Sequence, residues 1–162
     1  MTPAEYRTVR AGLGLSAQQV ANIAGVQLRT VQRWEKGQDR PRTGDVAVLL
    51  SQFDSKINTT VARMVASADR LPADSNPVLV RYTRGEDIPR PTLDLVPDMP
   101  DVVLTLHCAL VERTREALAI AGRRCRIVWF DAAAYLDWLA GRDDRVKLRE
   151  QWAISTIEGE AV

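Results

Sequence analysis

The chain has 162 residues, of which 46% are apolar, 27% are charged and 6% are aromatic. This length accommodates one ordinary domain or two small ones, and the apolar share suffices for a hydrophobic core, which excludes a wholly disordered chain. The net charge is +1, no apolar run approaches the ~20 residues of a membrane-spanning helix, and the charged first ten residues lack the apolar stretch of a secretory signal, so we expect a cytoplasmic protein.

Two capping boxes predict the first two helices. Thr2 is a good N-cap with Glu5 three residues later, and Ser16 is followed in the same way by Gln19. The apolar residues after each box recur at helical spacing. Gly25 ends the second of these helices after little more than two turns.

A third helix is predicted from about Gln27 to Lys36, with Gly37 as its C-cap. Leu28, Val31 and Trp34 recur along it at intervals of three residues, which predicts one buried face. Beyond Pro41, apolar residues keep helical periodicity over residues 46–68. This stretch predicts one long helix, or two end to end, that closes the N-terminal part.

A proline-rich stretch then divides the chain, since six of the eight prolines lie within residues 72–100. We predict an N-terminal domain over residues 1–70, a linker over 71–76 and a second domain over 77–162. In the second domain the pattern predicts a short strand at 77–83, a helix at 101–121, a buried strand at 125–130, a helix at 132–140 capped by Asp131, and a last helix from Asp143 to about Ile154. The expected fold class is mainly α with a small β element: an N-terminal bundle of four to five helices and a C-terminal α+β domain.

Basic residues are concentrated at the start of the chain. Residues 1–44 contain seven basic and three acidic residues, whereas residues 45–162 contain fifteen basic and eighteen acidic ones. A basic part on a mildly acidic remainder is typical of partial contact with a polyanion. A solvated helical surface gives the same distribution, so charge alone does not decide between them.

Residues 17–36 satisfy the packing rules of a helix-turn-helix. Val20 and Ala24 are placed to pack the second helix of the chain, which is the first of the motif, against its partner. Ala21 is small where the two helices cross, and Gly25 permits the left-handed backbone of the turn. Apolar anchors follow in the turn and in the second helix, at Val26, Val31 and Trp34. We expect Trp34 to lie in the core, and Glu35 to brace the turn or pair with an arginine.

Residues 1–66 resemble the Cro and phage-repressor (XRE) class of helix-turn-helix domain. The resemblance is carried by Leu15-Ser16-Ala17-Gln18-Gln19-Val20-Ala21 and by Gly25-Val26-Gln27-Leu28-Arg29-Thr30-Val31-Gln32-Arg33-Trp34-Glu35-Lys36-Gly37. Two positions depart from the family pattern. Ala17 replaces a glutamine that commonly holds a backbone phosphate, and Gln27 replaces the usual serine cap of the recognition helix.

The resemblance implies sequence-specific binding of double-stranded DNA, with the recognition helix in the major groove. The implied base-reading residues are Gln27, Leu28, Arg29, Gln32 and Arg33. The implied phosphate contacts are Gln18, Thr30, Lys36, Arg40 and Arg42. The same resemblance implies a transcription regulator, expected to be a repressor, that acts as a homodimer.

The second domain is expected to pair two subunits. The strand at 125–130 and the apolar face of Val103, Leu106, Leu110 and Leu118 suggest that it buries area against a second copy. Its segment 129–139 is also similar to the tails of anti-CRISPR-associated and other mobile-element autorepressors. Alternatives are an antitoxin-like or protein-interaction module, and a tail that binds a small-molecule or protein effector.

Catalysis and metal binding are not expected. A single histidine, His107, and two cysteines outside any CxxC spacing, Cys108 and Cys125, are too few ligands for a structural zinc site. Adjacent side chains on a helix diverge, which disfavours a Cys108–His107 pair. No cofactor is predicted, and the sequence favours a binding protein over an enzyme.

Overall fold

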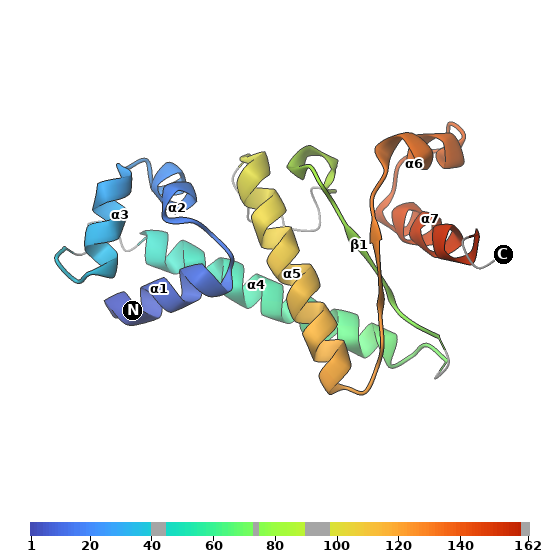
Figure 1. Ribbon diagram of the computed structural model, residues 1–162, viewed down its shortest axis with the longest axis horizontal. Helices are drawn as coiled ribbons and strands as arrows, with labels where there is room; N and C mark the ends of the chain where they lie inside the picture. Colours follow the sequence, from blue (N-terminus) through green and yellow to red (C-terminus); the bar gives the residue numbers. More distant parts are fainter. Residues whose placement is uncertain (40–44, 73–74, 90–97, 160–162) are drawn as a thin grey trace.

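The computed structural model describes residues 1–39, 45–72, 75–89 and 98–159 (Figure 1). The N-terminal part comprises α1 (Pro3–Gly12), α2 (Ala17–Ala24), α3 (Leu28–Glu35) and the long α4 (Asp45–Ala68). The C-terminal part comprises β1 (Val78–Arg81), a 3-10 turn η1 (Gly85–Asp87), α5 (Pro100–Ile120), β2 (Arg126–Trp129), α6 (Ala132–Leu139) and α7 (Val146–Gly159). The predicted fold class, mainly α with a small β element, is confirmed.

Local hydrogen bonds fix the start of the first two helices as predicted. The Glu5 backbone N–H donates to Thr2 Oγ1 (3.2 Å), and the Glu5 carboxylate accepts from the Thr2 N–H (2.6 Å). Ser16 and Gln19 form the same reciprocal box at the start of α2. Each box satisfies two N–H groups that the first turn of a helix leaves unpaired.

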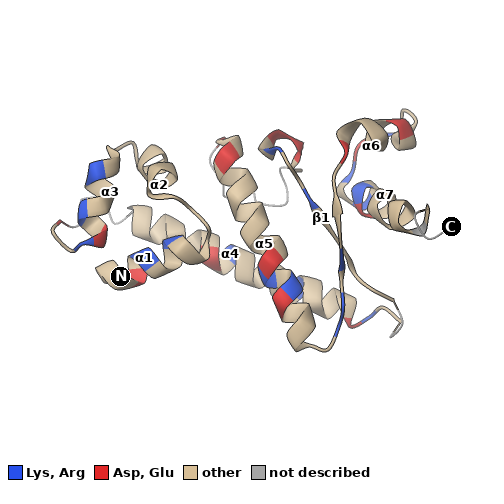
Figure 2. Ribbon diagram, viewed as in Figure 1, with Lys and Arg blue, Asp and Glu red and all other residues tan. Residues whose placement is uncertain are grey.

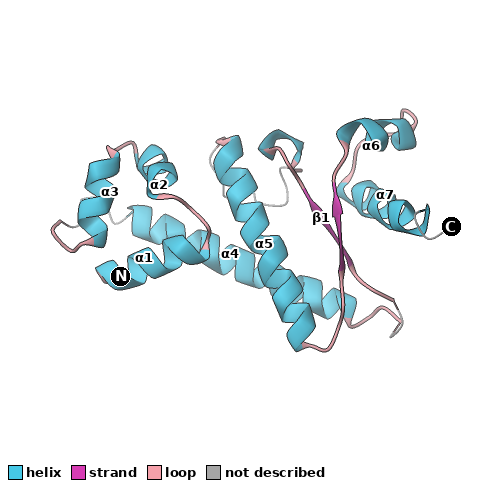
Figure 3. Cartoon of the chain, in the orientation of Figure 1, coloured by secondary structure: helices cyan, strands magenta, loops and turns pink. Residues whose placement is uncertain are grey.

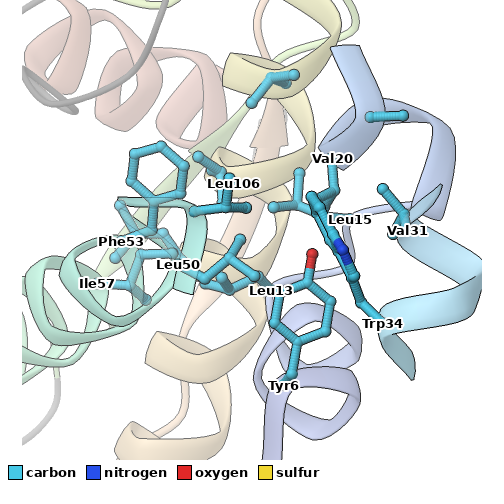
Figure 4. Packing of buried hydrophobic residues seen from close by; sticks show 14 residues of the cluster. Tyr6, Leu13, Leu15, Val20, Val31, Trp34, Leu50, Phe53, Ile57 and Leu106 are labelled. Carbon is cyan, nitrogen blue, oxygen red and sulfur yellow. The ribbon is translucent and has the colours of Figure 1, made fainter. Parts of the chain in front are cut away.

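The N-terminal core lies where α1, α2, α3 and α4 converge (Figure 4). Val20, Val31 and Trp34 are buried there, which confirms the predicted inward faces of α2 and α3. Tyr6 of α1 meets Trp34 edge to face, with the ring centroids 6.2 Å apart. The two short helices are therefore held by a shared core, since helices of this length are marginal in isolation.

Helix α5 completes this core although it comes after the proline-rich stretch. Its residues Val102, Leu106 and Leu110 are buried in the same cluster as Leu50 and Phe53 of α4. Figure 1 shows α5 crossing α4 at the centre of the molecule. The fifth helix of the N-terminal bundle thus comes from a segment that the sequence pattern assigns to the other domain.

Polar contacts tie α5 to the N-terminal part at two further points. The Gln19 side-chain amide donates to Thr105 Oγ1 (2.8 Å) and to the Asp101 carbonyl (3.2 Å). The Arg113 guanidinium bridges Asp54 (2.7 Å) and Asn58 (2.8 Å) on α4, and it also donates to the carbonyl of Gly12 at the end of α1 (2.7 Å).

The expectation that the apolar face of α5 pairs with a second copy is wrong. Leu106, Leu110 and Leu118 are buried within one chain, and Val103 packs against the cluster of the C-terminal part. The periodicity of α5 was a true signal of burial, but α4 of the same chain covers this face.

The C-terminal part is a β-α-β unit followed by two helices (Figure 3). Strands β1 and β2 pair in parallel, with Val78 beside Arg126 and Arg81 beside Trp129. A second cluster of buried side chains joins η1, the end of β2, α6 and α7: Tyr82, Ile88, Phe130, Tyr135, Leu139, Trp152 and Ala153.

Arg149 of α7 ties this aromatic cluster together. Its guanidinium carbon lies 4.8 Å from the Phe130 ring centroid and 5.4 Å from that of Tyr135. It also forms two hydrogen bonds to the Asp144 carboxylate and one to the Asp87 carbonyl. A guanidinium that stacks on aromatic rings and also forms a bidentate hydrogen-bonded pair with a carboxylate is held firmly in one position.

Two predictions about the C-terminal part need correction. The strand at 125–130 is buried on one face only: Val128 and Phe130 pack in the C-terminal cluster, whereas Ile127 and Trp129 on the other face are exposed, and β1 is the one described strand that pairs with β2. The last helix begins at Val146 and not after Asp143, and it continues to Gly159. Asp144 is engaged instead with Arg149 and with the Tyr135 hydroxyl (2.7 Å), which holds the preceding segment outside the helix. The predicted cap at Asp131 is confirmed, since it accepts from the N–H groups of Ala133 and Ala134.

Within the described residues, no helix combines the length and the apolar character needed to cross a bilayer.

Candidate nucleic-acid interface

The turn between α2 and α3 has the geometry that its sequence requires. Gly25 adopts a left-handed conformation with φ of +64°, a region that side chains with a Cβ disfavour. The Val26 N–H then donates to the Ala21 carbonyl (3.0 Å), which closes the end of α2. Only the residues 25–27 therefore separate α2 from α3, and α3 lies at an angle to α2 (Figure 1).

Helix α3 has one buried and one exposed face. Val31 and Trp34 point into the core, while the side chains of Arg29, Gln32 and Arg33 are exposed to solvent. Arg29, Gln32, Arg33, Lys36 and Gln38 line a single polar hollow of about 370 Å³. Figure 2 shows basic residues along this helix, at the end of the molecule opposite α6 and α7.

The start of α3 differs from a serine-capped recognition helix, as its sequence suggests. Gln27 is the N-cap residue, with extended backbone, and its side chain makes no capping hydrogen bond. Its exposed amide therefore extends from the first turn of α3. Helix N-termini are where recognition helices meet base edges.

Arg33 is already paired within the chain. Its guanidinium lies 3.6 Å from the Asp39 carboxylate, and both side chains are about half exposed, at 51% and 44%. Ion pairs at this exposure are worth little, ~0–1 kcal/mol. Arg33 can consequently exchange Asp39 for a stronger anionic or polar partner.

The far end of α3 is fixed to α1. Glu35 forms an ion pair with Arg10 (2.5 Å), in which both side chains are about 15% exposed, and Arg10 also donates to the Leu15 carbonyl. This confirms that Glu35 pairs with an arginine. Burial, together with the charge of Glu35, raises the pKa of the neighbouring Tyr6 to about 12, so the phenol stays neutral.

The other predicted contact residues are distributed as follows. Gln18 is exposed on α2, where its amide donates to the Asn22 side chain (2.9 Å). Leu28 and Thr30 are half-buried on α3. Arg40 and Arg42 lie outside the described residues.

Sequence reasoning missed Gln38, Asp39 and Arg10 at this site. Gln38 joins the polar hollow, and Asp39 and Arg10 pair with residues of α3. Acidic residues just after a basic helix are a usable signal for Asp39. No sequence signal identifies Arg10, since its partner is 25 residues away.

The titratable residues of the C-terminal part do not belong to this site. His107 is buried against Tyr82, with the ring centroids 5.0 Å apart, so it is a packed residue of the C-terminal part. Burial, and secondarily the charge of Arg81, lowers the pKa of His107 to about 4. Cys108 and Cys125 are free thiols that are partly buried.

In a comparison with known protein families, residues 7–58 match the helix-turn-helix family HTH_3, which is of the XRE type. This range begins within α1, spans the α2–turn–α3 unit and ends within α4. No curated protein matches the chain. The match and the exposed basic helix agree, and residues 7–58 are therefore a helix-turn-helix domain of the XRE type, the domain of DNA-binding transcription regulators.

Proposed function

We propose that this protein recognises a specific sequence in double-stranded DNA and represses transcription there as a homodimer. The observation that carries the proposal is the two-faced helix α3. Its exposed side bears Arg29, Gln32, Arg33 and Lys36 around one hollow, and its other side is anchored by Val31 and Trp34. An α-helix fits the major groove, where its side chains reach base edges.

The residue types on this face suit base recognition. Arg29 and Arg33 are long and charged, and each can donate two hydrogen bonds to guanine O6 and N7. Gln27 or Gln32 can pair in the same bidentate manner with adenine, and Leu28 can contact a thymine methyl group.

Phosphate contacts are proposed at the edges of this face. Lys36 follows the helix, and Gln18 and Thr30 come from its flanks; Arg40 and Arg42 are assigned from the sequence alone. Contacts to phosphates set the register of a protein on DNA and carry no sequence information directly.

The contacts that hold α3 in place favour specific binding, because a helix that is already fixed loses little conformational entropy when it contacts DNA. The Arg10–Glu35 pair and the Tyr6–Trp34 contact fix the helix before binding. Repression then follows from occupancy of an operator, and two subunits related by a two-fold axis would read half-sites about 34 Å apart.

The test is selection of DNA ligands from a random pool by the full chain. We expect enrichment of a palindromic sequence with half-sites about ten base pairs apart. Arg29→Ala or Arg33→Ala should weaken binding to this sequence by about 1–3 kcal/mol, on the order of ten- to a hundredfold, and relax the preference at one base pair.

Arg145→Ala is the matched control, since it removes the same charge from an arginine that is 75% exposed and lies before α7. This control should change the affinity for the selected DNA less than threefold. A pool from which no sequence is enriched, or equal losses in all three variants, would contradict the proposal.

A second candidate is a protein-interaction or antitoxin-like module in which DNA binding is secondary. Exposed Ile127 and Trp129 in the C-terminal part favour a protein contact there. The two functions differ in salt dependence, because phosphate contacts release counterions. A shallow decline of DNA affinity with salt, with a tight protein complex through the C-terminal part, would support the second candidate.

A further inference from the structure

Strand β2 has an open edge. The N–H groups of Arg126 and Phe130 donate to the carbonyls of Pro77 (2.9 Å) and Arg81 (2.8 Å), so this side of β2 faces β1. Backbone groups of successive residues point to opposite edges of a strand, so those of Ile127 and Trp129 face away from β1. No other described strand lies beside that edge.

The same two residues expose large apolar side chains. Trp129 is 58% exposed and Ile127 is 39% exposed. The Arg81 guanidinium lies 5.4 Å from the Trp129 ring centroid, but the side chain stays largely in contact with solvent. An unpaired edge with exposed apolar residues is a surface at which proteins associate, and isolated chains usually protect it with charge or proline.

The charges around β2 favour a second copy in antiparallel orientation. Arg124 and Arg126 stand at the start of the strand and Asp131 follows its end, and all three are exposed. Parallel pairing of two copies would place arginine beside arginine. Antiparallel pairing places the arginines of each copy beside Asp131 of the other, and a two-fold axis makes both ends equivalent.

The open backbone groups also define the register. In an antiparallel ladder, outward-facing residues form the pairs that exchange two hydrogen bonds. A two-fold axis through Val128 sets Ile127 opposite Trp129 of the partner subunit, and Trp129 opposite Ile127 of the partner subunit. Each pair then exchanges two backbone hydrogen bonds, and Val128 faces its own counterpart in the non-hydrogen-bonded position.

We propose that two copies of this chain associate by antiparallel pairing of β2 with β2, with Ile127 and Trp129 at the centre of the interface. This inference rests on the proposed homodimer and assigns its surface. It joins two marginal two-stranded sheets into one sheet of four strands. It also replaces the dimer face on α5, which the structure shows to be buried within the chain.

The test measures association of the full chain by sedimentation equilibrium in the absence of DNA. Ile127→Pro removes an outward N–H without removing a hydrogen bond to β1, and Trp129→Lys places a charge at the interface. Each should raise the dimer dissociation constant at least tenfold. Val48→Lys, at a residue of α4 that is 55% exposed, is the matched control and should change it less than threefold.

Cross-linking tests the register separately. In a Cys108→Ser, Cys125→Ser background, Val128→Cys should give a disulfide-linked dimer on mild oxidation, because Cα atoms in non-hydrogen-bonded pairs lie about 4.5 Å apart. Thr83→Cys, at an exposed residue beyond the end of β1, should stay monomeric in the same experiment. Circular dichroism melts of every variant show whether it folds, and only folded variants are compared.

The outcomes separate this inference from the proposed function. A wild-type dimer that neither Ile127→Pro nor Trp129→Lys weakens, with no cross-link at position 128, would overturn the β2 interface and leave a dimeric repressor. Equal weakening of the dimer by Val48→Lys would indicate an interface on α4 and would also overturn the β2 interface. A wild-type chain that is monomeric at all concentrations, yet binds half-site DNA, would remove the dimer and leave DNA recognition by α3 standing.

Discussion

Replacing Leu106 by alanine tests whether α5 is part of the DNA-binding domain. Leu106 is fully buried in the cluster that includes Val20, Leu50 and Trp34. The substitution removes three carbon atoms, worth about 0.8 kcal/mol each in lost transfer free energy, and it leaves a cavity that raises the total to about 3–5 kcal/mol. Loss on this scale is a large part of the stability of a domain, which is typically ~5–15 kcal/mol.

Urea unfolding followed by circular dichroism gives the size of the effect. Ile120→Ala is the control on the same helix, because Ile120 is 89% exposed and its truncation should cost less than about 0.5 kcal/mol. Hydrogen exchange then locates the effect. We expect faster exchange in α2 and α4 as well as in α5, since all three share the cluster around Leu106.

Two results would refute this reasoning. A free energy of unfolding for Leu106→Ala equal to that of Ile120→Ala would show that Leu106 does not support the core. Faster exchange confined to residues 98–159, with α2 and α4 unchanged, would show that the N-terminal helices fold independently of α5.

Two further predictions concern the turn and the buried histidine. Gly25→Ala should lower the free energy of unfolding, measured by heat or urea, by about 1 kcal/mol. The cause is the left-handed backbone with φ of +64° and not a steric clash, since nothing lies within 4 Å of the added Cβ. An unchanged stability would contradict this backbone strain. For His107, the folded state keeps the imidazole neutral with a pKa of about 4, while the unfolded chain takes up a proton near pH 6.5. Stability is therefore full above about pH 6.5 and declines as the pH falls toward 4, by about 2 kcal/mol between pH 7 and pH 5. His107 is the single histidine of the chain, so His107→Phe should flatten urea midpoints over that interval, and an unchanged slope would show that another group titrates there.

The sequence by itself determined those parts of the fold that depend on neighbours within a few residues. The boxes at Thr2 and Ser16 and the left-handed Gly25 form as predicted, because each satisfies backbone groups of its own turn. The inward faces of α2 and α3 were also predictable, since residues three or four apart on a helix share a face. These local features suffice to identify the helix-turn-helix and its exposed arginines.

Only the tertiary structure decided what the apolar faces of the remaining segments contact. Periodicity predicted that α5 is buried but not that α4 of the same chain covers it, and Arg113 meets Gly12 across 101 residues of sequence. The residues of β2 are as apolar as those of a central strand, yet β2 lies at an edge with Trp129 exposed. A pattern records that a side chain favours burial, whereas its partner depends on how distant segments pack. This is why the sequence identified the helix-turn-helix with the helix proposed to read DNA, but not the surface proposed to join two subunits.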